Sequence, residues 1–346
     1  MSDGLIAIRT VTAWVTDMFR RRDFIIMQTA ALAAAGGLLA SARALAEEDW
    51  PKRTVSIVVP FAAGGSADLL GRLLAQHLQA KFNVPFVVEN RGGAGGSIGT
   101  GVVAKAAADG QTLLIGTVST HAINPALYAH LPFDVEKDFV PISLLVRLPN
   151  LLVVNNDVPA KTVPELIAWL KANEGKVSFG SSGNGTSSHL AAVMFQIATG
   201  THMTHVPFRS TADEMNNMMG GSIQLAIDSM TTLWPLARGG KVRAIAVSTP
   251  QRVGAAPDVP TIGETVQGFE ATGWQGLYAP AGTPQPIVDK IAGEVKRIFS
   301  DPQVVTALAN VGGEPAPMTP EAFAEFARVE RGKWAEVVKA AGVRIQ

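Results

Sequence analysis

The segment "VVPFAAGGSADLLGR" places glycines and a hydroxyl side chain between a strand-like run and a helical one. The run Val55–Phe61 is followed by Gly64, Gly65 and Ser66, and then by leucines at helical spacing. A glycine turn at a helix start exposes backbone N–H groups, and the helix dipole favours an anion there. We expect Ser66 to cap this helix and Asp68 to lie in its first turn. Because the loop has no lysine, it does not match the phosphate loop of nucleotide-binding proteins.

Two further segments repeat this arrangement of strand, polar loop and helix. One is "FGSSGNGTSSHL", in which Gly183 and Gly185 leave the backbone accessible, and the other is "LIGTVSTHAINP". Their hydroxyl donors are Thr117, Ser119, Thr120, Ser181, Ser182, Thr186, Ser187 and Ser188. Loops at the carboxyl ends of strands gather at one edge of an α/β sheet. The three loops therefore suit a small oxyanion held by neutral donors, although each loop taken alone is also consistent with a simple turn.

Two charged residues are candidates for the same site. Asp228 ends the strand-like run "QLAIDS", where its carboxylate could accept a ligand ammonium group or hold a loop in place. Arg209, in "HVPFRST", could reach a ligand cleft or stabilise a domain wall. The sequence leaves both alternatives open at both positions.

An enzymatic interpretation rests on the string Gly95–Gly99, which matches the G-x-S-x-G pattern of a hydrolase nucleophile elbow around Ser97. The string follows its strand-like run only after the loop "RGGAGG", whereas a nucleophile elbow turns sharply. We therefore favour a packing role for these glycines. The pair His202 and His205 has no nearby carboxylate in a metal-site pattern, so we expect neither a metal nor a cofactor.

The composition is that of a globular protein of about two domains. The chain has 346 residues, of which 47% are hydrophobic, and its formal net charge is zero. No basic excess is available to attract nucleic acid. Cysteine is absent, which excludes disulfides and thiolate metal sites.

The N-terminus has the features of an export signal. A basic cluster at Arg20–Arg22 precedes a weakly apolar run, Phe24–Ala40, and a small-residue pattern, Ala44–Ala46. The sequence "RRDFII" resembles a twin-arginine signal. We expect residues 1–46 to be removed, the mature chain to begin at Glu47, and the protein to be periplasmic. An ordinary secretion signal or a retained amphipathic anchor is the alternative.

Short runs rich in valine and isoleucine alternate with helical stretches, which predicts a doubly wound α/β fold, with two sheets rather than one. We expect residues 47–147 and 275–346 to form one domain and residues 148–274 the other. The segments Arg147–Val154 and Gly268–Pro280 would cross between the domains. Two crossings form a hinge with a cleft beneath it, where small ligands commonly bind.

Several motifs in a fixed order resemble the Bug, or TctC, family of extracytoplasmic solute receptors. They include "WPKRTVSIVVPFAAGGSADLLGR", "VENRGGAGGSIGTGVVAKAAADGQTLLIGT", "GNGTSSHL", "VPFRST" and "APAGTP", and the resemblance runs from about Trp50 to the C-terminus. It implies a monomeric two-domain periplasmic binding protein of the type II class, each domain a sheet flanked by helices. Such a protein captures a small di- or tricarboxylate for the membrane permease subunits of a tripartite tricarboxylate transporter. A sensory receptor that passes its signal to another protein would bind its ligand in the same way.

The resemblance also implies roles for particular loops. The loop Phe61–Asp68, which includes Ala63, would hold one carboxylate through backbone amides and ordered waters. The loops Thr117–Thr120 and Ser181–Ser187 would hold the other end of the ligand, with Asp228 at the same cleft. This chain departs from the family pattern at Ala62–Ala63, Val118–Ser119 and Phe208–Ser210. Since these positions lie in or near the expected cleft, they leave the identity of the ligand open.

Overall fold

The structure, a computed structural model, describes residues 50–342 and 344. The predicted export segment 1–46 and the predicted start of the mature chain at Glu47 lie outside the described residues. Within residues 50–342, none of the helices combines the length and apolar character that a membrane span needs.

Residues 51–342 contain two separate β-sheets, and the first has six strands in the order β11-β4-β10-β3-β1-β2. Its strands are β1 (Val55–Val59), β2 (Phe86–Asn90), β3 (Thr112–Thr117), β4 (Phe139–Leu148), β10 (Gly273–Pro280) and β11 (Glu314–Pro315). Its helices are α2 (Ser66–Phe82), η1 (Ala94–Gly96), α3 (Ser97–Ala104), η2 (Ser119–Ile123), α4 (Asn124–Leu127), α9 (Gln285–Phe299), α10 (Pro302–Ala309) and α11 (Pro320–Ala341). We call this assembly the first lobe.

The second sheet has five strands in the order β7-β6-β8-β5-β9. Its strands are β5 (Asn150–Val154), β6 (Ser178–Ser181), β7 (Thr204–Pro207), β8 (Leu225–Ser229) and β9 (Arg243–Val247). The helices that flank this sheet are α5 (Val163–Ala172), α6 (Ser187–Thr199), α7 (Thr211–Met219), α8 (Met230–Arg238) and η3 (Ile262–Glu264). We call this assembly the second lobe. Two sheets flanked by helices confirm the predicted α/β class.

The sheets are mixed, whereas the predicted doubly wound fold is built on mostly parallel sheets. Strand β1 runs parallel to β2 and β3, and β6 runs parallel to β7 and β8. In contrast, β10 is antiparallel to β3 and β4, and β5 is antiparallel to β8 and β9. The antiparallel strands are those that carry the chain between the lobes, because a chain that leaves a sheet and returns beside its own exit runs in the opposite direction.

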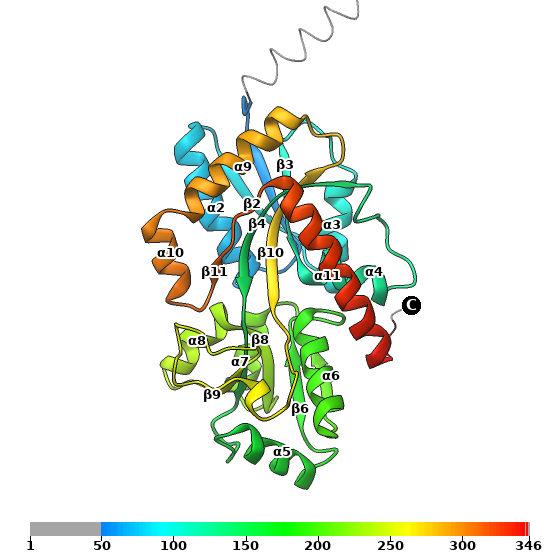
Figure 1. The fold of residues 1–346 in the computed structure, drawn as a ribbon, viewed down its shortest axis with the longest axis vertical. Helices are drawn as coiled ribbons and strands as arrows, with labels where there is room; N and C mark the ends of the chain where they lie inside the picture. The colour runs from blue at the N-terminus through cyan, green and yellow to red at the C-terminus, as the bar shows by residue number, and fades with distance from the viewer. Residues whose placement is uncertain (1–49, 343, 345–346) are drawn as a thin grey trace, which may run out of the picture. The chain divides into compact units, whose positions relative to one another are not determined.

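The two crossings lie next to each other. Strand β4 continues into β5 with only Pro149 between them, and Figure 1 shows β4 and β10 side by side, running from one lobe toward the other. The side chains of Asn150 and Ser248 both donate to the carbonyl oxygen of Ala271, each at 2.7 Å. These hydrogen bonds join the start of β5 to the segment that returns to β10, so the crossing is an ordered structure rather than a loose linker.

A third contact between the lobes comes from the C-terminal helix. Helix α11 packs against β4 and η2 of the first lobe and also against α6 of the second lobe. The fully buried Leu190 of α6 belongs to the same apolar cluster as Trp334 and Val338 of α11. The indole N–H groups of Trp274 and Trp334 both donate to the Glu330 carboxylate, at 3.0 and 3.2 Å, which fixes α11 against β10.

Candidate functional site

A small cavity lies between the two lobes, beside the crossing strands, with a volume of about 60 Å³. Its lining comprises Phe61, Gly65, Ser66, Ala67, Thr117, Val118, Ser119, Leu148, Asn150, Ser182, Ser187, Ser210, Thr211, Asp228, Ser229, Gly273, Trp274 and Gln275. Hydroxyl groups dominate the polar part of this lining, and Asp228 is its one ionisable side chain. Among the described residues, no lysine, arginine or histidine lines it.

Four helices point their N-terminal ends at this cavity. Helix α2 comes from the first lobe, and α6, α7 and α8 come from the second; each contributes a capping or first-turn residue to the lining. Each N-terminus carries unsatisfied backbone N–H groups and about half a positive elementary charge from the helix dipole. The cavity therefore favours an anion although its lining has no cationic side chain.

The start of α2 leaves its backbone N–H groups uncapped. The N-cap is Gly65, in an extended conformation with φ of −86°, and no side chain caps this helix. The expectation that Ser66 caps it is wrong: Ser66 is the first helical residue, and its Oγ instead accepts a hydrogen bond from Nε2 of Gln275, at 2.9 Å. The Ser66 hydroxyl keeps its own proton to donate. This helix start thus offers backbone and hydroxyl donors to the cavity.

Asp68 fixes the loop rather than lining the cavity. Its buried carboxylate accepts hydrogen bonds from the Gly64 N–H and Asn90 Nδ2, both at 3.0 Å, and pairs with Arg72 at 3.0 Å. Burial by itself would raise the pKa of Asp68, but the hydrogen bonds from Arg72, Gly64 and Asn90 outweigh burial and lower it. The positive φ in this loop, 86°, occurs at Gly64. Ala63 and Gly64 are exposed and do not line the cavity.

In the loop after β3, Thr117 and Ser119 line the cavity and Thr120 does not. Thr120 is fully buried, and its Oγ1 accepts the Thr117 N–H at 3.0 Å and lies 2.8 Å from Nδ1 of His121. Ser119 Oγ accepts the Ser187 N–H at 3.0 Å, which connects the two lobes beside the cavity. Its hydroxyl proton remains available to a ligand.

The hydroxyl side chains of the loop after β6 also fall into two groups, those that line the cavity and those that do not. Ser182 and Ser187 line the cavity, whereas Ser181 and Thr186 hold the loop in shape. Ser181 Oγ lies 2.6 Å from Nε2 of His205, and Thr186 caps α6 by accepting the backbone N–H of His189 at 3.4 Å. The expected ligand residues in these loops are therefore of two kinds, those that face the cavity and those that position its walls.

Asp228 lies at the cavity, and Arg209 does not. Asp228 is the penultimate residue of β8, and its Oδ1 accepts the Ser229 N–H at the start of α8. Arg209 is exposed and outside the lining, whereas its neighbours Ser210 and Thr211 line the cavity at the start of α7.

Five polar lining residues were not among the sequence-based candidates: Asn150, Ser210, Thr211, Ser229 and Gln275. A local signal for Ser210 did exist, since a serine three residues before an acidic residue is a helix-start pattern, and Ser210 accepts the Asp213 N–H as a cap. Asn150 and Gln275 had no such signal, because they reach the cavity only through the long-range pairing of the crossing strands.

Ser97 lacks the surroundings of a nucleophile. It is buried as the first residue of α3, and its Oγ accepts a hydrogen bond from Nδ2 of Asn124 at 3.0 Å. A side-chain amide cannot act as the general base that activates a serine. The hydrolase interpretation therefore loses its basis. Over residues 50–342 there is also no cluster of three or more potential metal-binding side chains.

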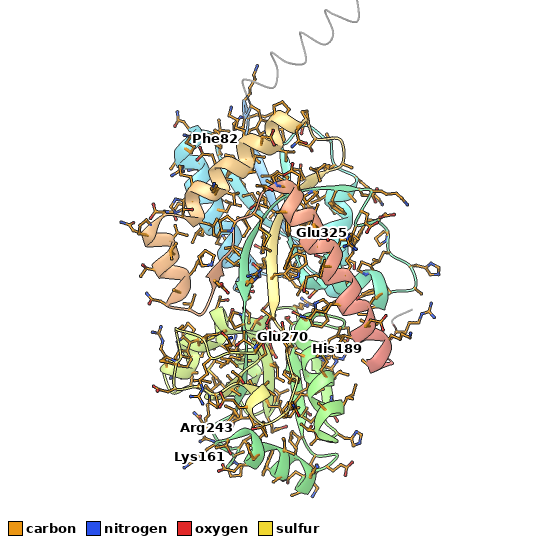
Figure 2. The ribbon with its side chains drawn as sticks, in the orientation of Figure 1. Phe82, Lys161, His189, Arg243, Glu270 and Glu325 are labelled. Carbon is orange, nitrogen blue, oxygen red and sulfur yellow. The ribbon has the colours of Figure 1, made fainter. Side chains whose placement is uncertain are left out.

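A larger groove of about 840 Å³ lies on another face of the crossing and contains Arg147, Arg252 and Lys333. Two of these cations are paired with carboxylates: Arg252 with Glu264 at 2.8 Å, and Lys333 with Glu270 at 3.1 Å. The third, Arg147, lies over the Phe326 ring, 5.8 Å from its centre. Figure 2 shows Glu270 where the two lobes meet. Because paired surface charges have little residual attraction for an anion, we assign the ligand site to the smaller cavity.

Comparison with known proteins agrees with this geometry. Residues 70–343 match the model of the TctC family, described as the tripartite tricarboxylate transporter family receptor. The chain belongs to this family. A UPF0065 protein of Pseudomonas sp. (strain P51), from the tcbD–tcbE intergenic region, is 34% identical over 300 residues, which are 86% of this chain and 89% of that protein.

Two solved TctC-like structures from Rhodopseudomonas palustris have the same fold. Rpa4515, solved with adipate, is 34% identical and superposes with a TM-score of 0.84 over 85% of this chain and 99% of that one. MatC, solved with bound malate, is 33% identical, with a TM-score of 0.79 over 84% of this chain and all of that one (100%). The periplasmic binding protein BugD is 36% identical, with a TM-score of 0.83 over 86% of this chain and 100% of that one. The predicted family and the two-domain fold of a periplasmic binding protein are confirmed.

Proposed function

We propose that this chain is a periplasmic receptor that captures a small organic di- or tricarboxylate for uptake by a tripartite tricarboxylate transporter. The observation that carries the proposal is the convergence of four helix N-termini from both lobes on one cavity rich in hydroxyl groups. A carboxylate bound there would accept hydrogen bonds from backbone N–H and hydroxyl groups, which are shorter and stronger for an ionised acceptor than for a neutral one.

The two ends of the ligand would have different partners. One carboxylate would lie at the start of α2, against the backbone of Gly65 and Ala67 and the hydroxyl of Ser66. The other end would meet the hydroxyls of Ser119 and Ser187, which are already hydrogen-bonded across the lobes. That Rpa4515 was solved with adipate and MatC with malate supports an acid with two carboxyl groups.

The remaining sequence-based candidates would act on the walls of the site. Asp68, Thr120, Ser181 and Thr186 make hydrogen bonds that shape the three loops, and their substitution would change affinity indirectly. For Arg209, exposed and outside the lining, we propose no ligand contact.

We propose that binding involves closure of the two domains, residues 47–147 with 275–346 and residues 148–274, about the crossings near Pro149 and Ala271. The Ser119–Ser187 hydrogen bond joins the lobes beside the cavity, so a ligand must enter before it forms or after it breaks. The chain would act as a monomer that presents the closed form to the permease.

Export by the twin-arginine route is a separate proposal, motivated by the pair Arg21 and Arg22 before a weakly apolar run. Replacing both arginines by lysine should leave the precursor in the cytoplasm, whereas the same replacement at Arg53 should not. An unchanged periplasmic yield from the double variant would exclude this route.

Thermal unfolding of the mature chain with a panel of acids tests the binding proposal. Adipate and malate are the first probes, with sulfate and the uncharged diamide of adipate as controls. A ligand at 100 times its Kd stabilises the folded state by about 2.7 kcal/mol. Stabilisation by a dicarboxylate but not by the diamide supports the proposal. Equal stabilisation by the diamide, or a response to sulfate alone, would contradict it.

A further inference from the structure

Two carboxyl groups lie together at the wall of the cavity. Glu214 on α7 is fully buried, and Asp228 at the end of β8 is 5% exposed and lines the cavity. Asp228 Oδ1 accepts the Ser229 N–H. Within the described residues, both carboxyl oxygens of Glu214 and Oδ2 of Asp228 are buried without a hydrogen-bond donor.

Three buried carboxyl oxygens without donors would be costly if both groups were ionised. Each unsatisfied buried group costs about 1–3 kcal/mol, and more when it is charged. Two adjacent like charges away from water add repulsion. One proton removes the repulsion and most of the unsatisfied hydrogen bonding, because a protonated Glu214 donates its O–H to Oδ2 of Asp228. The neutral carbonyl oxygen of Glu214 is then the one oxygen of the three without a donor. Burial, followed by the negative charge of Asp228 and the hydrogen bond to it, raises the pKa of Glu214 well above its usual range.

The packing around α7 explains why the pair is isolated. This helix contacts β6, β8 and α8. Of the titratable groups on these elements, Asp213 and Arg238 are exposed, and Asp228 is the group whose charge raises the pKa of Glu214. His205 of the adjacent strand β7 is hydrogen-bonded to Ser181.

Gly180 on β6 makes room for the Glu214 side chain. A Cβ atom at position 180 would lie 2.7 Å from Glu214 Cγ and 2.8 Å from Oε1. Glu214 therefore lies directly on the backbone of the sheet, within reach of the strand that carries Asp228.

We propose that Glu214 is a positioning residue of the ligand site: it stays protonated and donates a hydrogen bond to Asp228, so that the pair presents one negative charge, not two, to a bound anion. The role in binding rests on the proposed carboxylate-receptor function. The ligand is expected to bind most tightly below the pKa of Glu214 and to lose affinity as the pH rises through it. An orienting effect follows as well, since Oδ1 and Oδ2 of Asp228 then each accept one hydrogen bond from the protein.

Infrared difference spectroscopy of the ligand-free mature chain tests the protonation directly. At about pH 7, where an unperturbed glutamate is ionised, the wild-type protein should show the carbonyl band of a carboxylic acid, and Glu214→Gln should lack it. Glu264→Gln is the matched control: Glu264 pairs with Arg252, whose hydrogen bond lowers the pKa of Glu264 to about 2, so that variant loses a carboxylate and keeps the acid band. A wild-type spectrum without this band, or a band that survives in Glu214→Gln, would overturn the proposal.

Calorimetric titration with adipate and malate tests the role in binding. Glutamine is neutral and can donate to Asp228, so Glu214→Gln should bind like the wild type at about pH 7. On raising the pH, any loss of the wild-type acid band should be matched by loss of wild-type affinity, while the variant stays unchanged. A tenfold or larger loss in folded Glu214→Gln at pH 7, about 1.4 kcal/mol, would contradict this role.

Failure of the proposed function has a different signature. If the wild-type protein binds neither acid, the receptor proposal fails and the binding role of Glu214 fails with it, while the infrared comparison still decides whether Glu214 is protonated. If Glu214→Gln does not fold, Asp228→Asn replaces it: removing the Asp228 charge should lower the pH at which the acid band disappears, and an unchanged titration would overturn the proposal.

Discussion

Replacing Gly65 by alanine should weaken ligand binding and leave the protein folded. The residue is the N-cap of α2 and lines the cavity, with φ of −86°, which any residue adopts. A Cβ atom at this position would have only the Ala62 carbonyl oxygen nearby, at 4.0 Å. The new methyl would therefore stand in the space where we place the carboxylate, and the fold would accommodate it. The positive φ of this turn, 86°, belongs to Gly64 instead.

The expected loss is that of at least one hydrogen bond from a backbone N–H to a charged carboxylate. Such a bond contributes about 1.5–3 kcal/mol, so Gly65→Ala should weaken binding by about 10- to 150-fold. The cost to folding should be about 1 kcal/mol, the typical cost of replacing a good N-cap residue by alanine. Gly65→Val should weaken binding further because its methyl groups reach deeper into the cavity.

Calorimetric titration with adipate and malate, together with urea unfolding, measures both quantities. Gly293→Ala is the matched control, since Gly293 is exposed within α9 and a Cβ atom there meets nothing within 4 Å. Gly64→Ala is the opposite case, with φ of 86° and the Ala212 Cβ only 3.2 Å away, and should lose stability. Wild-type affinity in Gly65→Ala, with folding intact, would refute the placement of the carboxylate at the start of α2.

Three further outcomes are expected. Asp68→Asn should lower the free energy of unfolding by about 1.5–3 kcal/mol in urea titrations, because a charged acceptor of several hydrogen bonds and the partner of Arg72 is lost; unchanged stability would contradict the structural role. Burial lowers the pKa of His121 to about 3, of His189 to about 4 and of His205 to about 3. These histidines stay neutral in the folded state and take up protons on unfolding below about pH 6.5. Each should therefore lower the free energy of unfolding by about 1.4 kcal/mol per pH unit as the pH falls from about 6.5 to about 4. Thermal unfolding that does not change with pH across this window would argue against burial of the neutral rings. Small-angle scattering should show a smaller radius of gyration with saturating adipate or malate than without, and an equal radius would indicate that the lobes do not close.

The elements of the fold were largely predictable because their signals are local. Strand-like runs rich in valine and isoleucine, glycine turns and helical leucine spacing each lie within a short stretch of chain. The three strand-end loops were found for that reason, and residues such as Gly65, Thr117 and Ser187 do line the cavity. Strand direction was less predictable. Continuous apolar runs are typical of parallel strands, but β5 is antiparallel to both of its neighbours and is also buried along its whole length, so its sequence shows the same pattern.

Which residues of each loop line the cavity and which hold the loop in shape was not predictable, because this depends on partners that are distant in the sequence. The Ser66 hydroxyl is hydrogen-bonded to Gln275, more than two hundred positions away in the chain, and Ser181 on β6 is hydrogen-bonded to His205 on the neighbouring strand β7. Thr120 and Ser119 look equivalent in sequence, yet one is fully buried against Thr117 and the other faces the cavity. Asn150 and Gln275 reach the cavity only once β4, β5 and β10 have paired, and a pattern within either strand does not show this.

A crystal structure of the mature chain with adipate or malate bound would test the location of the site most directly. We predict one carboxylate with its oxygens about 2.7–3.2 Å from backbone N–H groups at the start of α2, and the other end of the acid beside Ser119 and Ser187. Ligand density in the larger groove beside Arg147 and Arg252, with the cavity between the lobes empty, would contradict the proposed site.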